Sequence, residues 1–475
     1  MDANGHSRGG RVPTLQFLGG TGTVTGSKYL VRSDGSSILV DCGLYQGLRE
    51  LRERNWEPLP LDPAELDAVV LTHAHVDHCG YLPRLVAAGF DGPVYASENT
   101  AALARIVLPD CAHLLEEEAA YANRRGFSRH DPALPLYTEE QAWRSLEQLC
   151  RLPFGEEQEI APGVTITLRR AGHILGAASV HLRAGETRST VAFSGDLGRN
   201  NHPFLVAPDP AGDVDVLLVE STYGDREHVE GEPTEALGTA IRRTFDRGGS
   251  VLIPAFAVDR TEVILHHLAL LVAAGHVPVS VPIYVDSPMA LSALEVYRAA
   301  LARAHPEIRT ERAGAEMFDL PALREVRDVE GSKALNDPSR PCIVVSASGM
   351  ATGGRVVHHL AHWLPDPRHT VVLVGYQAQG TRGRQLADGV SELKMLGRYV
   401  RVRAEIVDLP QFSVHADQSE LLDWVATASP APEVAYVVHG EPAASNTLAQ
   451  RIEERFDVTA VVPRYGERVR LDRLR

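Results

Sequence analysis

The chain has 475 residues, 44% of them hydrophobic and 23% charged, which are globular values and predict two or more lobes rather than one core. Its net charge of -15 argues against a protein that coats nucleic acid, although bound dications would make one cleft locally positive. No apolar run reaches the roughly 18 residues of a membrane span, and the polar N-terminus lacks a signal-peptide core, so we expect a cytoplasmic protein with no membrane partner.

In chain order, the first half of the sequence predicts short strands separated by glycine turns. From about Thr234 helices and strands alternate, which predicts a parallel α/β lobe, and after about residue 390 short strands return with one helix. The pattern therefore predicts one α/β lobe with a second α/β lobe inserted late in it. The strands expected before Thr234 lie at 15–20, 27–33, 36–43, 164–185, 189–198 and 214–224. Strand–loop–helix units are expected at 64–89 and 93–108, and a helical stretch at 110–150. The helix expected in the C-terminal part lies at 418–427.

The stretch LTHAHVDHCGYLPRL, residues 71–85, concentrates three histidines and an aspartate directly after an apolar strand. His73 and His75 are two positions apart, so an extended loop presents both imidazoles on one side. Asp77 and His78 fall at the start of the following helix and project from another direction, so one loop could serve two metal ions. Imidazole and carboxylate suit zinc at about 2.0–2.2 Å. The alternative is a polar helix cap with chance histidines.

Three further candidate ligands stand at predicted strand ends beside glycine, where the backbone can approach closely: His173, Asp196 and His439. Each alone fits an ordinary loop residue, but as a set they complete a dinuclear site. Asp196 is the natural bridging carboxylate, and a hydroxide held between the metals would be the nucleophile, since a metal lowers the pKa of bound water to about 7. Asp41, in LVDCG, is expected to orient a ligand imidazole, with a simple turn aspartate as the alternative.

These residues resemble the successive motifs of the metallo-β-lactamase superfamily. VESTYG (219–224), FSVHAD (412–417) and VVHGE (437–441) are similar to the three extra motifs of the β-CASP nucleases, the branch of the 3′-end pre-mRNA endonuclease and its bacterial and archaeal relatives. LGGTGTVTGSKYLV, IPAFAVDRTEVIL, DSPMA, SASGMATGGR and GYQAQGTRGR extend the resemblance over nearly the whole chain. It implies an αββα metallo-β-lactamase sandwich formed by 1–206 and 391–475, with an inserted α/β β-CASP domain at 207–390.

The resemblance also implies a role for each motif residue. Asp77, Glu220 and His415 would be catalytic, with Glu220 and His415 hydrogen-bonded near the leaving oxygen and His415 as its general acid. The alternatives are a capping or salt-bridging carboxylate for Glu220 and a packing histidine in a turn for His415. Two Zn²⁺ are expected per chain, with Mn²⁺ as the alternative. His73, His75 and His173 would hold one ion, and Asp77, His78 and His439 the other, with Asp196 between them.

Two glycine-rich loops in the expected insertion suggest how a nucleic acid could be held. In SASGMATGGR the backbone N–H groups around Ser348 and Gly349 can point at phosphate, and Arg355 can add a charged fork. In YQAQGTRGR, Arg382 and Arg384 could follow the phosphate backbone. The alternative is two ordinary strand-to-helix turns with solvated arginines.

The function expected from the resemblance is a zinc-dependent ribonuclease of RNA processing or decay. It would cut single-stranded RNA internally by a metal-bridged hydroxide, leaving 5′-phosphate and 3′-hydroxyl ends, with 5′-3′ exonuclease action and a homodimer also among the expectations. His439, in place of an aliphatic residue, resembles the RNA-directed members more than the DNA-repair members. The alternatives are a lactonase- or thioesterase-type hydrolase, which would not need VEST, FSVHAD or the inserted lobe, and a DNA-directed nuclease. A catalytically dead scaffold is disfavoured because every expected ligand is present, and a flavo-diiron reductase because it would need a carboxylate in place of His75 and a flavin domain.

Overall fold

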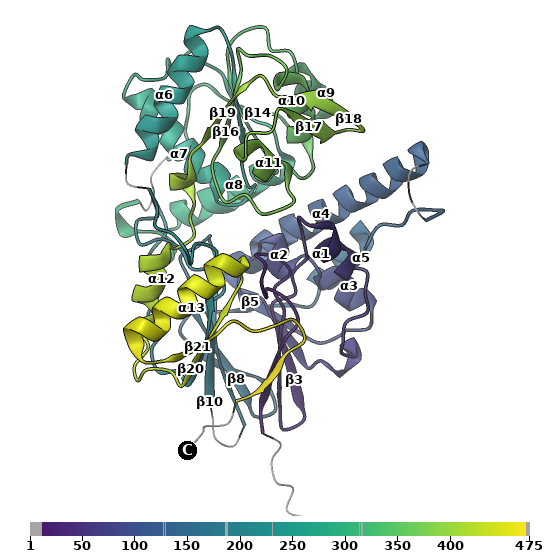
Figure 1. The fold of residues 1–475 in the computed structure, drawn as a ribbon, viewed down its shortest axis with the longest axis vertical. Coiled ribbons are helices and arrows are strands. Elements are labelled where there is room, and N and C mark those ends of the chain that lie inside the picture. Colours follow the sequence, from purple (N-terminus) through teal and green to yellow (C-terminus); the bar gives the residue numbers. More distant parts are fainter. Residues whose placement is uncertain are drawn as a thin grey trace, which may run out of the picture.

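The computed structural model describes residues 12–126, 128, 130–185, 189–229, 231–312, 314 and 317–471. Two lobes lie one above the other, and the chain leaves the lower lobe after β11, forms the upper lobe, and returns through α12 and α13 (Figure 1). We call the lower one the sandwich lobe and the upper one the inserted lobe. None of the helices in the described residues is both long and apolar enough to cross a membrane.

The sandwich lobe contains two seven-stranded sheets. The last strand of the chain closes the first sheet by pairing antiparallel with the first strand. In the order in which they pair, the strands of the first sheet are β22 (Arg468–Arg470), β1 (Thr14–Phe17), β2 (Tyr29–Ser33), β3 (Ser36–Val40), β4 (Ala68–Val70), β5 (Val94–Ser97) and β6 (Leu149–Leu152). Those of the second are β21 (Thr459–Val461), β20 (Val434–Val438), β11 (Val216–Glu220), β10 (Ser189–Phe193), β9 (Ala178–Ala184), β8 (Val164–Arg170) and β7 (Glu157–Ala161).

The two sheets bury one core between them, in which Phe17, Tyr29, Phe193 and Leu218 pack together. β8 alternates buried and half-buried residues, as expected of a strand with one face in the core, whereas β10 and β11 are buried throughout. In Figure 1, α1, α3, α4 and α5 lie beside the first sheet, and α12 and α13 beside the second. The helices of this lobe are α1 (Arg49–Arg54), η1 (Pro63–Glu65), α2 (Val76–Cys79), α3 (Leu82–Ala87), α4 (Glu98–Arg125), α5 (Glu139–Leu146), η3 (Pro410–Phe412), α12 (Gln418–Val425) and α13 (Pro442–Phe456).

The inserted lobe is built on a six-stranded parallel sheet. Its central strands are buried along their whole length, which is typical of a sheet covered on both faces. In order of pairing its strands are β14 (Leu323–Glu325), β13 (Ile283–Val285), β15 (Ile343–Ser346), β12 (Val251–Pro254), β16 (Thr370–Leu373) and β19 (Glu405–Asp408), with a separate hairpin of β17 (Glu392–Met395) and β18 (Arg398–Arg401). Its helices are α6 (Pro233–Asp246), α7 (Arg260–Ala273), α8 (Pro288–Ala302), η2 (Thr310–Arg312), α9 (Val329–Ala334), α10 (Arg355–Trp363) and α11 (Arg382–Ala387).

The αββα sandwich with an inserted α/β lobe is the fold expected from the sequence. The chain changes sheets later than the expected limits at 207 and 390, because β11 belongs to the sandwich and β19 to the inserted sheet; the exact domain limits stay a prediction. The C-terminal part contains two helices rather than one. α13 escapes a periodicity search because its buried face consists partly of small residues, Ala444, Ser445 and Ala449.

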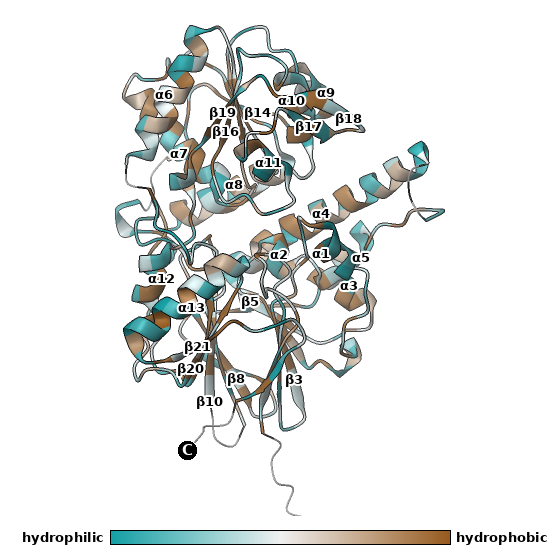
Figure 2. Cartoon of the chain, viewed as in Figure 1, coloured by the Kyte–Doolittle hydropathy of each residue, from teal (hydrophilic) through white to brown (hydrophobic). Residues whose placement is uncertain are grey.

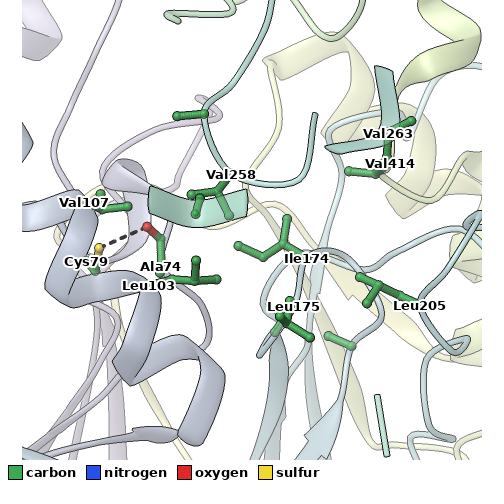
Figure 3. Packing of buried hydrophobic residues seen from close by; sticks show 14 of the residues in the cluster. Ala74, Cys79, Leu103, Val107, Ile174, Leu175, Leu205, Val258, Val263 and Val414 are labelled. Carbon is green, nitrogen blue, oxygen red and sulfur yellow. Dashed lines mark hydrogen bonds between the residues drawn. The ribbon is translucent and has the colours of Figure 1, made fainter. Parts of the chain in front are cut away.

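The two lobes meet through an apolar seam that continues the core of each. Val258 of the inserted lobe lies near Ala74, Leu103 and Ile174 of the sandwich lobe, and Val263 lies beside Val414, all in one buried cluster (Figure 3). In Figure 2 the strands of both lobes are mostly brown, whereas the surface helices α1 and α11 carry teal residues. The seam packs the inserted lobe against the loops that carry the candidate ligands.

Candidate metal centre

The candidate ligands gather where strands of the sandwich end beneath the inserted lobe. His73 and His75 follow β4, Asp196 follows β10 and His439 follows β20, while His173 lies in the turn between β8 and β9. Because β10, β11 and β20 run parallel, the residues after them share one edge of the second sheet. The ligands predicted from the sequence therefore lie together in space.

One group contains His73, His75, His173 and Asp196, whose candidate ligand atoms all lie within 4.8 Å of one another. The Nδ1 atom of His75 is 3.1 Å from Nε2 of His73 and 3.3 Å from Nε2 of His173. Tetrahedral ligands about 2.1 Å from a zinc ion lie about 3.4 Å apart, so the spacing fits one ion of that size.

The second group contains Asp77, His78 and His439 under the same 4.8 Å criterion. The Nε2 atom of His439 is 3.8 Å from the Oδ2 atom of Asp77. This group lies beside the first, since the rings of His73 and His78 are 4.1 Å apart between centroids.

Asp196 faces both groups with different oxygens. Its Oδ2 atom is 3.5 Å from Nε2 of His73 and 3.7 Å from Nε2 of His173. Its Oδ1 atom is 3.2 Å from Nε2 of His78 and 3.6 Å from Nε2 of His439. The carboxylate thus presents one oxygen to each ligand group.

Burial decides the protonation of most of these imidazoles. It lowers the pKa of His73 and His173 well below the ordinary value, and that of His75 to about 4. Burial also opposes the charge of His78, but Asp196 and Asp41 outweigh it and raise its pKa. Neutral imidazole is the form that binds a metal, so the first group is ready at neutral pH, whereas His78 would release a proton on binding.

Two imidazoles are oriented by hydrogen bonds on the nitrogen that faces away from the cluster. Nδ1 of His78 donates to Oδ2 of Asp41 over 2.7 Å, and Asp41 also accepts from the backbone N–H and hydroxyl of Thr72. Nδ1 of His439 lies 2.8 Å from the hydroxyl of Ser27. Both rings therefore present Nε2 to the cluster. Asp41 contacts a candidate ligand imidazole, and its role stays a prediction. Ser27 and Thr72 were not predicted, because nothing in their local sequence distinguishes them.

The loop after β4 is held by backbone contacts with the LVDCG turn. Cys42 N–H donates to the carbonyl of His78 and Ser27 N–H to that of Asp77. A Cβ atom at Gly43 would come within 1.6 Å of the Asp77 carbonyl oxygen, so only glycine allows this approach. His75 is the N-cap of the four-residue helix α2, which places Asp77 and His78 on its first turn.

Glu220 and His415 form the pair expected beside the cluster. Nδ1 of His415 is 3.2 Å from Oε1 of Glu220 and 4.0 Å from Oδ2 of Asp196. Glu220 is fully buried and also accepts the N–H groups of Leu197 and Thr222. Burial opposes the charge of the His415 imidazole, but Glu220 and Asp196 outweigh it and raise its pKa. The pair can therefore hold a proton next to the cluster.

A helix cap fixes His415 in this position. Asp417, two residues later, is the N-cap of α12 and forms a capping box with Glu420. His228 donates through Nε2 to the carbonyl of His415 over 2.8 Å. The FSVHAD motif is thus a turn locked at both ends, with the His415 side chain directed at Glu220.

One aromatic ring, that of Phe256, lies between the SASGMATGGR loop and the first ligand group. Phe256 sits 6.0 Å from the ring of His75, and a Cβ atom at Gly349 would come within 2.7 Å of the Phe256 side chain. Ser348 accepts the N–H of Thr352 within the same loop. The backbone thus approaches the cluster, but phosphate binding by this loop stays a prediction.

The three arginines expected to bind phosphate are each hydrogen-bonded within the protein. Arg355 donates to Asp286 over 2.7 Å and to the carbonyls of Val326 and Arg327. Arg382 donates to the carbonyls of Ala351, Thr352 and Lys394. Arg384 pairs with Asp388 on its own helix. Arg355 and Arg382 therefore brace loops in this structure, and a role in substrate binding would require them to exchange partners.

Three family profiles match successive parts of the chain. The "Metallo-beta-lactamase superfamily" matches residues 21–239, the "Beta-Casp domain" residues 261–386, and the "Zn-dependent metallo-hydrolase RNA specificity domain" residues 399–463. The metallo-β-lactamase fold implies binding of divalent metal ions, and the two ligand groups suit that requirement.

Similar proteins include Ribonuclease TTHA0252 of Thermus thermophilus, 38% identical over 454 residues, covering 95% of this chain and 98% of that protein. Transcription termination factor FttA of Pyrococcus horikoshii is 33% identical over 482 residues, covering 96% and 70%. FttA of Methanocaldococcus jannaschii is 30% identical over 477 residues, covering 96% and 71%. A crystal structure described as a protein of unknown function from Enterococcus faecalis V583 shares the fold, with a TM-score of 0.54 and 16% identity over 97% of this chain and 100% of that one. The chain belongs to the β-CASP family of the metallo-β-lactamase superfamily.

Proposed function

We propose that the protein is a zinc-dependent ribonuclease that hydrolyses phosphodiester bonds of single-stranded RNA. The observation that carries the proposal is the placement of Asp196 between two ligand groups, with the Glu220–His415 pair beside it. Two adjacent metal positions suit a phosphodiester, because they can neutralise charge on both the attacking and the leaving oxygen. A relative named a ribonuclease, similar over nearly the full length of both chains, supports RNA as the substrate.

The residues present fit two zinc ions better than harder dications. Five of the seven candidate ligands are imidazoles, which suit zinc, while the carboxylates leave Mn²⁺ as the alternative. Asp196 Oδ1, His75 Nε2, His78 Nε2 and His173 Nδ1 are buried and lack a hydrogen-bond partner among the described residues. His78 Nε2 and Asp196 Oδ1 lie 3.2 Å apart within the cluster without a hydrogen bond of good geometry, so bound ions would give both buried atoms a partner. The ions would supply Lewis acidity and an activated water.

The chain's own residues would then position substrate and move protons. Asp41, Ser27 and Thr72 hold the imidazoles in one orientation before substrate arrives. His415, whose pKa is raised once Glu220 and Asp196 outweigh burial, donates its proton to the departing 3′-oxygen. Glu220 keeps the imidazole in place and stabilises its charged form. The products are a 5′-phosphate and a 3′-hydroxyl.

The test uses purified protein of known metal content with end-labelled single-stranded RNA and the matching DNA, each with and without a 5′-phosphate. Internal cuts in RNA alone, abolished by a chelator and restored by Zn²⁺, are the expected result. Equal cleavage of DNA would replace the proposal with a DNA-directed nuclease. No cleavage of either polymer by protein with two bound ions would favour a small-molecule ester hydrolase.

A cytoplasmic location and a homodimer belong to the same proposal. Light scattering of the purified protein tests the second, since a dimer would have twice the mass of the 51.6 kDa chain.

A further inference from the structure

One buried guanidinium lies at the end of the inserted-lobe loop whose Phe256 ring contacts His75, and it has no role in the arrangement described so far. Arg260, the first residue of α7, is only 5% exposed. Its Nε and Nη1 atoms have no hydrogen-bond partner within the described part of the chain. By contrast, Arg355 and Arg382, in the two glycine-rich loops, donate to carbonyl or carboxylate oxygens.

A buried guanidinium without hydrogen bonds is costly, because it cannot lose its charge to escape the penalty. Glu262, two residues later, is also buried, and burial raises the pKa of its carboxyl well above the ordinary value, which disfavours its charged form. Burial lowers the pKa of Arg260, opposed by nearby Asp259 and Tyr223, yet a guanidinium remains protonated in proteins. Such a charge is retained where an anion completes its hydrogen bonds.

The carboxylate of the preceding residue, Asp259, is already engaged elsewhere. Its Oδ1 atom accepts a hydrogen bond from the hydroxyl of Tyr297 over 2.9 Å, and its Oδ2 atom lies 3.2 Å from Nε2 of His202. Asp259 has a φ angle of 71°, which a non-glycine residue adopts only when its surroundings impose it. Arg260 is therefore held in a fixed backbone position while the neighbouring carboxylate is tied to other groups.

The surroundings place this guanidinium at the cleft. Val258, two residues before Arg260, is buried in the seam near Ile174, which follows the ligand His173, and Val263 on the other side lies beside Val414, which precedes His415 (Figure 3). A Cβ atom at Gly375 would lie 3.7 Å from Nε of Arg260, so the absence of a side chain there leaves space beside the guanidinium. The helix that Arg260 begins packs against the segment before His415, since the ring centroids of His267 in α7 and Phe412 are 5.0 Å apart.

We propose that Arg260 binds a phosphate oxygen of the substrate next to His415. This rests on the proposed ribonuclease function for the identity of the substrate, but not for the existence of an anion site. Two or three N–H donors on a rigid fork match a phosphate oxygen pair. Arg260 would help align the scissile phosphate with the general acid and offset charge that develops on it.

The experiment compares the metal-loaded wild type with Arg260→Met, which keeps the volume of the side chain and removes the charge. The affinity for inorganic phosphate is measured by calorimetry, together with zinc content and single-turnover cleavage of end-labelled RNA. Arg243→Met is the matched control, because Arg243 lies in the same lobe but pairs with Glu405 on the surface. Arg260→Gln replaces the first variant if the methionine variant does not fold.

Loss of a charged hydrogen-bonding group predicts phosphate binding weakened about 10- to 100-fold in Arg260→Met, with unchanged zinc content and a comparable loss in cleavage rate. Arg243→Met should match the wild type in each measurement. Equal phosphate affinity in wild type and Arg260→Met would overturn the inference while leaving the ribonuclease proposal intact. Phosphate binding that depends on Arg260 in a wild type that cleaves no RNA would instead contradict the ribonuclease proposal and leave the anion site.

Discussion

The site contains two kinds of side chain: candidate metal ligands and residues that would transfer a proton. His75 contributes Nδ1 to the first ligand group and is buried with a pKa lowered to about 4. The imidazole of His415 instead pairs with Glu220, and its Nδ1 atom lies 4.0 Å from Oδ2 of Asp196. The two histidines therefore predict different consequences when they are replaced.

We expect His75→Ala to lose metal and to lower RNA cleavage below detection, because a ligand has been removed. His415→Ala should keep its metal and cleave roughly 10²- to 10⁴-fold more slowly, the range of general acid catalysis. Metal analysis and single-turnover cleavage distinguish them, with His113→Ala as the control on the exposed part of α4. Metal loss in His415→Ala would remove its assignment as a leaving-group acid.

At the scale of elements, the loop that carries His173 depends on a contact between the lobes. Glu307, in the connection after α8, accepts from Gly176 N–H and from the Asn99 side chain at the start of α4, each over 2.6 Å. Burial raises the pKa of this carboxyl to about 7, although both hydrogen bonds act in the opposite direction. The folded protein thus favours neutral Glu307 and must accept its charge as pH rises.

The raised pKa determines how stability should depend on pH. The contribution of neutral Glu307 to the free energy of unfolding is complete below pH 4.5 and is lost as pH rises through about 7. The reason is that the unfolded chain releases this proton at a lower pH than the folded protein does. Wild type should therefore lose roughly 3 kcal/mol more unfolding free energy than Glu307→Gln between pH 4.5 and 7.5. Urea unfolding of both proteins at the two pH values measures this difference. Parallel pH profiles would show that Glu307 is ionised in the folded state throughout.

At the scale of the whole molecule, the cluster joins parts of the chain that are far apart in sequence. Ser27 and His439 are 412 positions apart and meet at 2.8 Å. Ligands come from the loops after β4, β8, β10 and β20, so a bound ion links both sheets of the sandwich. Ligands that bind only the folded state stabilise it by mass action.

Removal of the metal should therefore lower the thermal unfolding midpoint as well as abolish cleavage. An ion present at a thousand times its dissociation constant contributes about 4 kcal/mol per site. Scanning calorimetry of wild type before and after chelation, and again after Zn²⁺ is restored, measures the effect. His75→Ala should show a smaller shift on chelation. An unchanged midpoint in wild type would mean that the two groups bind no metal that matters for the fold.

Much of the site could be predicted from sequence because its motifs are short and local. HAHVDH places four polar side chains on one turn after a buried strand, and glycine flanks His173, Asp196 and His439 at loop positions. Periodicity also predicted the parallel strands of the inserted lobe, which are buried along their length. Periodicity did not predict α13, whose buried face consists partly of small residues. It also did not predict the points at which the chain changes sheets, since these depend on which strands pair rather than on local pattern.

The sequence by itself determined the family, the candidate ligands and the pairing expected of Glu220 with His415. Only the tertiary structure decided that Asp196 turns one oxygen to each ligand group and that Arg355 and Arg382 are already hydrogen-bonded. It also decided that Nε and Nη1 of Arg260 have no hydrogen-bond partner among the residues that the structure describes. The reason is physical. Residue type and spacing specify which chemistry a side chain can offer, whereas its partners and its burial come from segments that are distant in the chain.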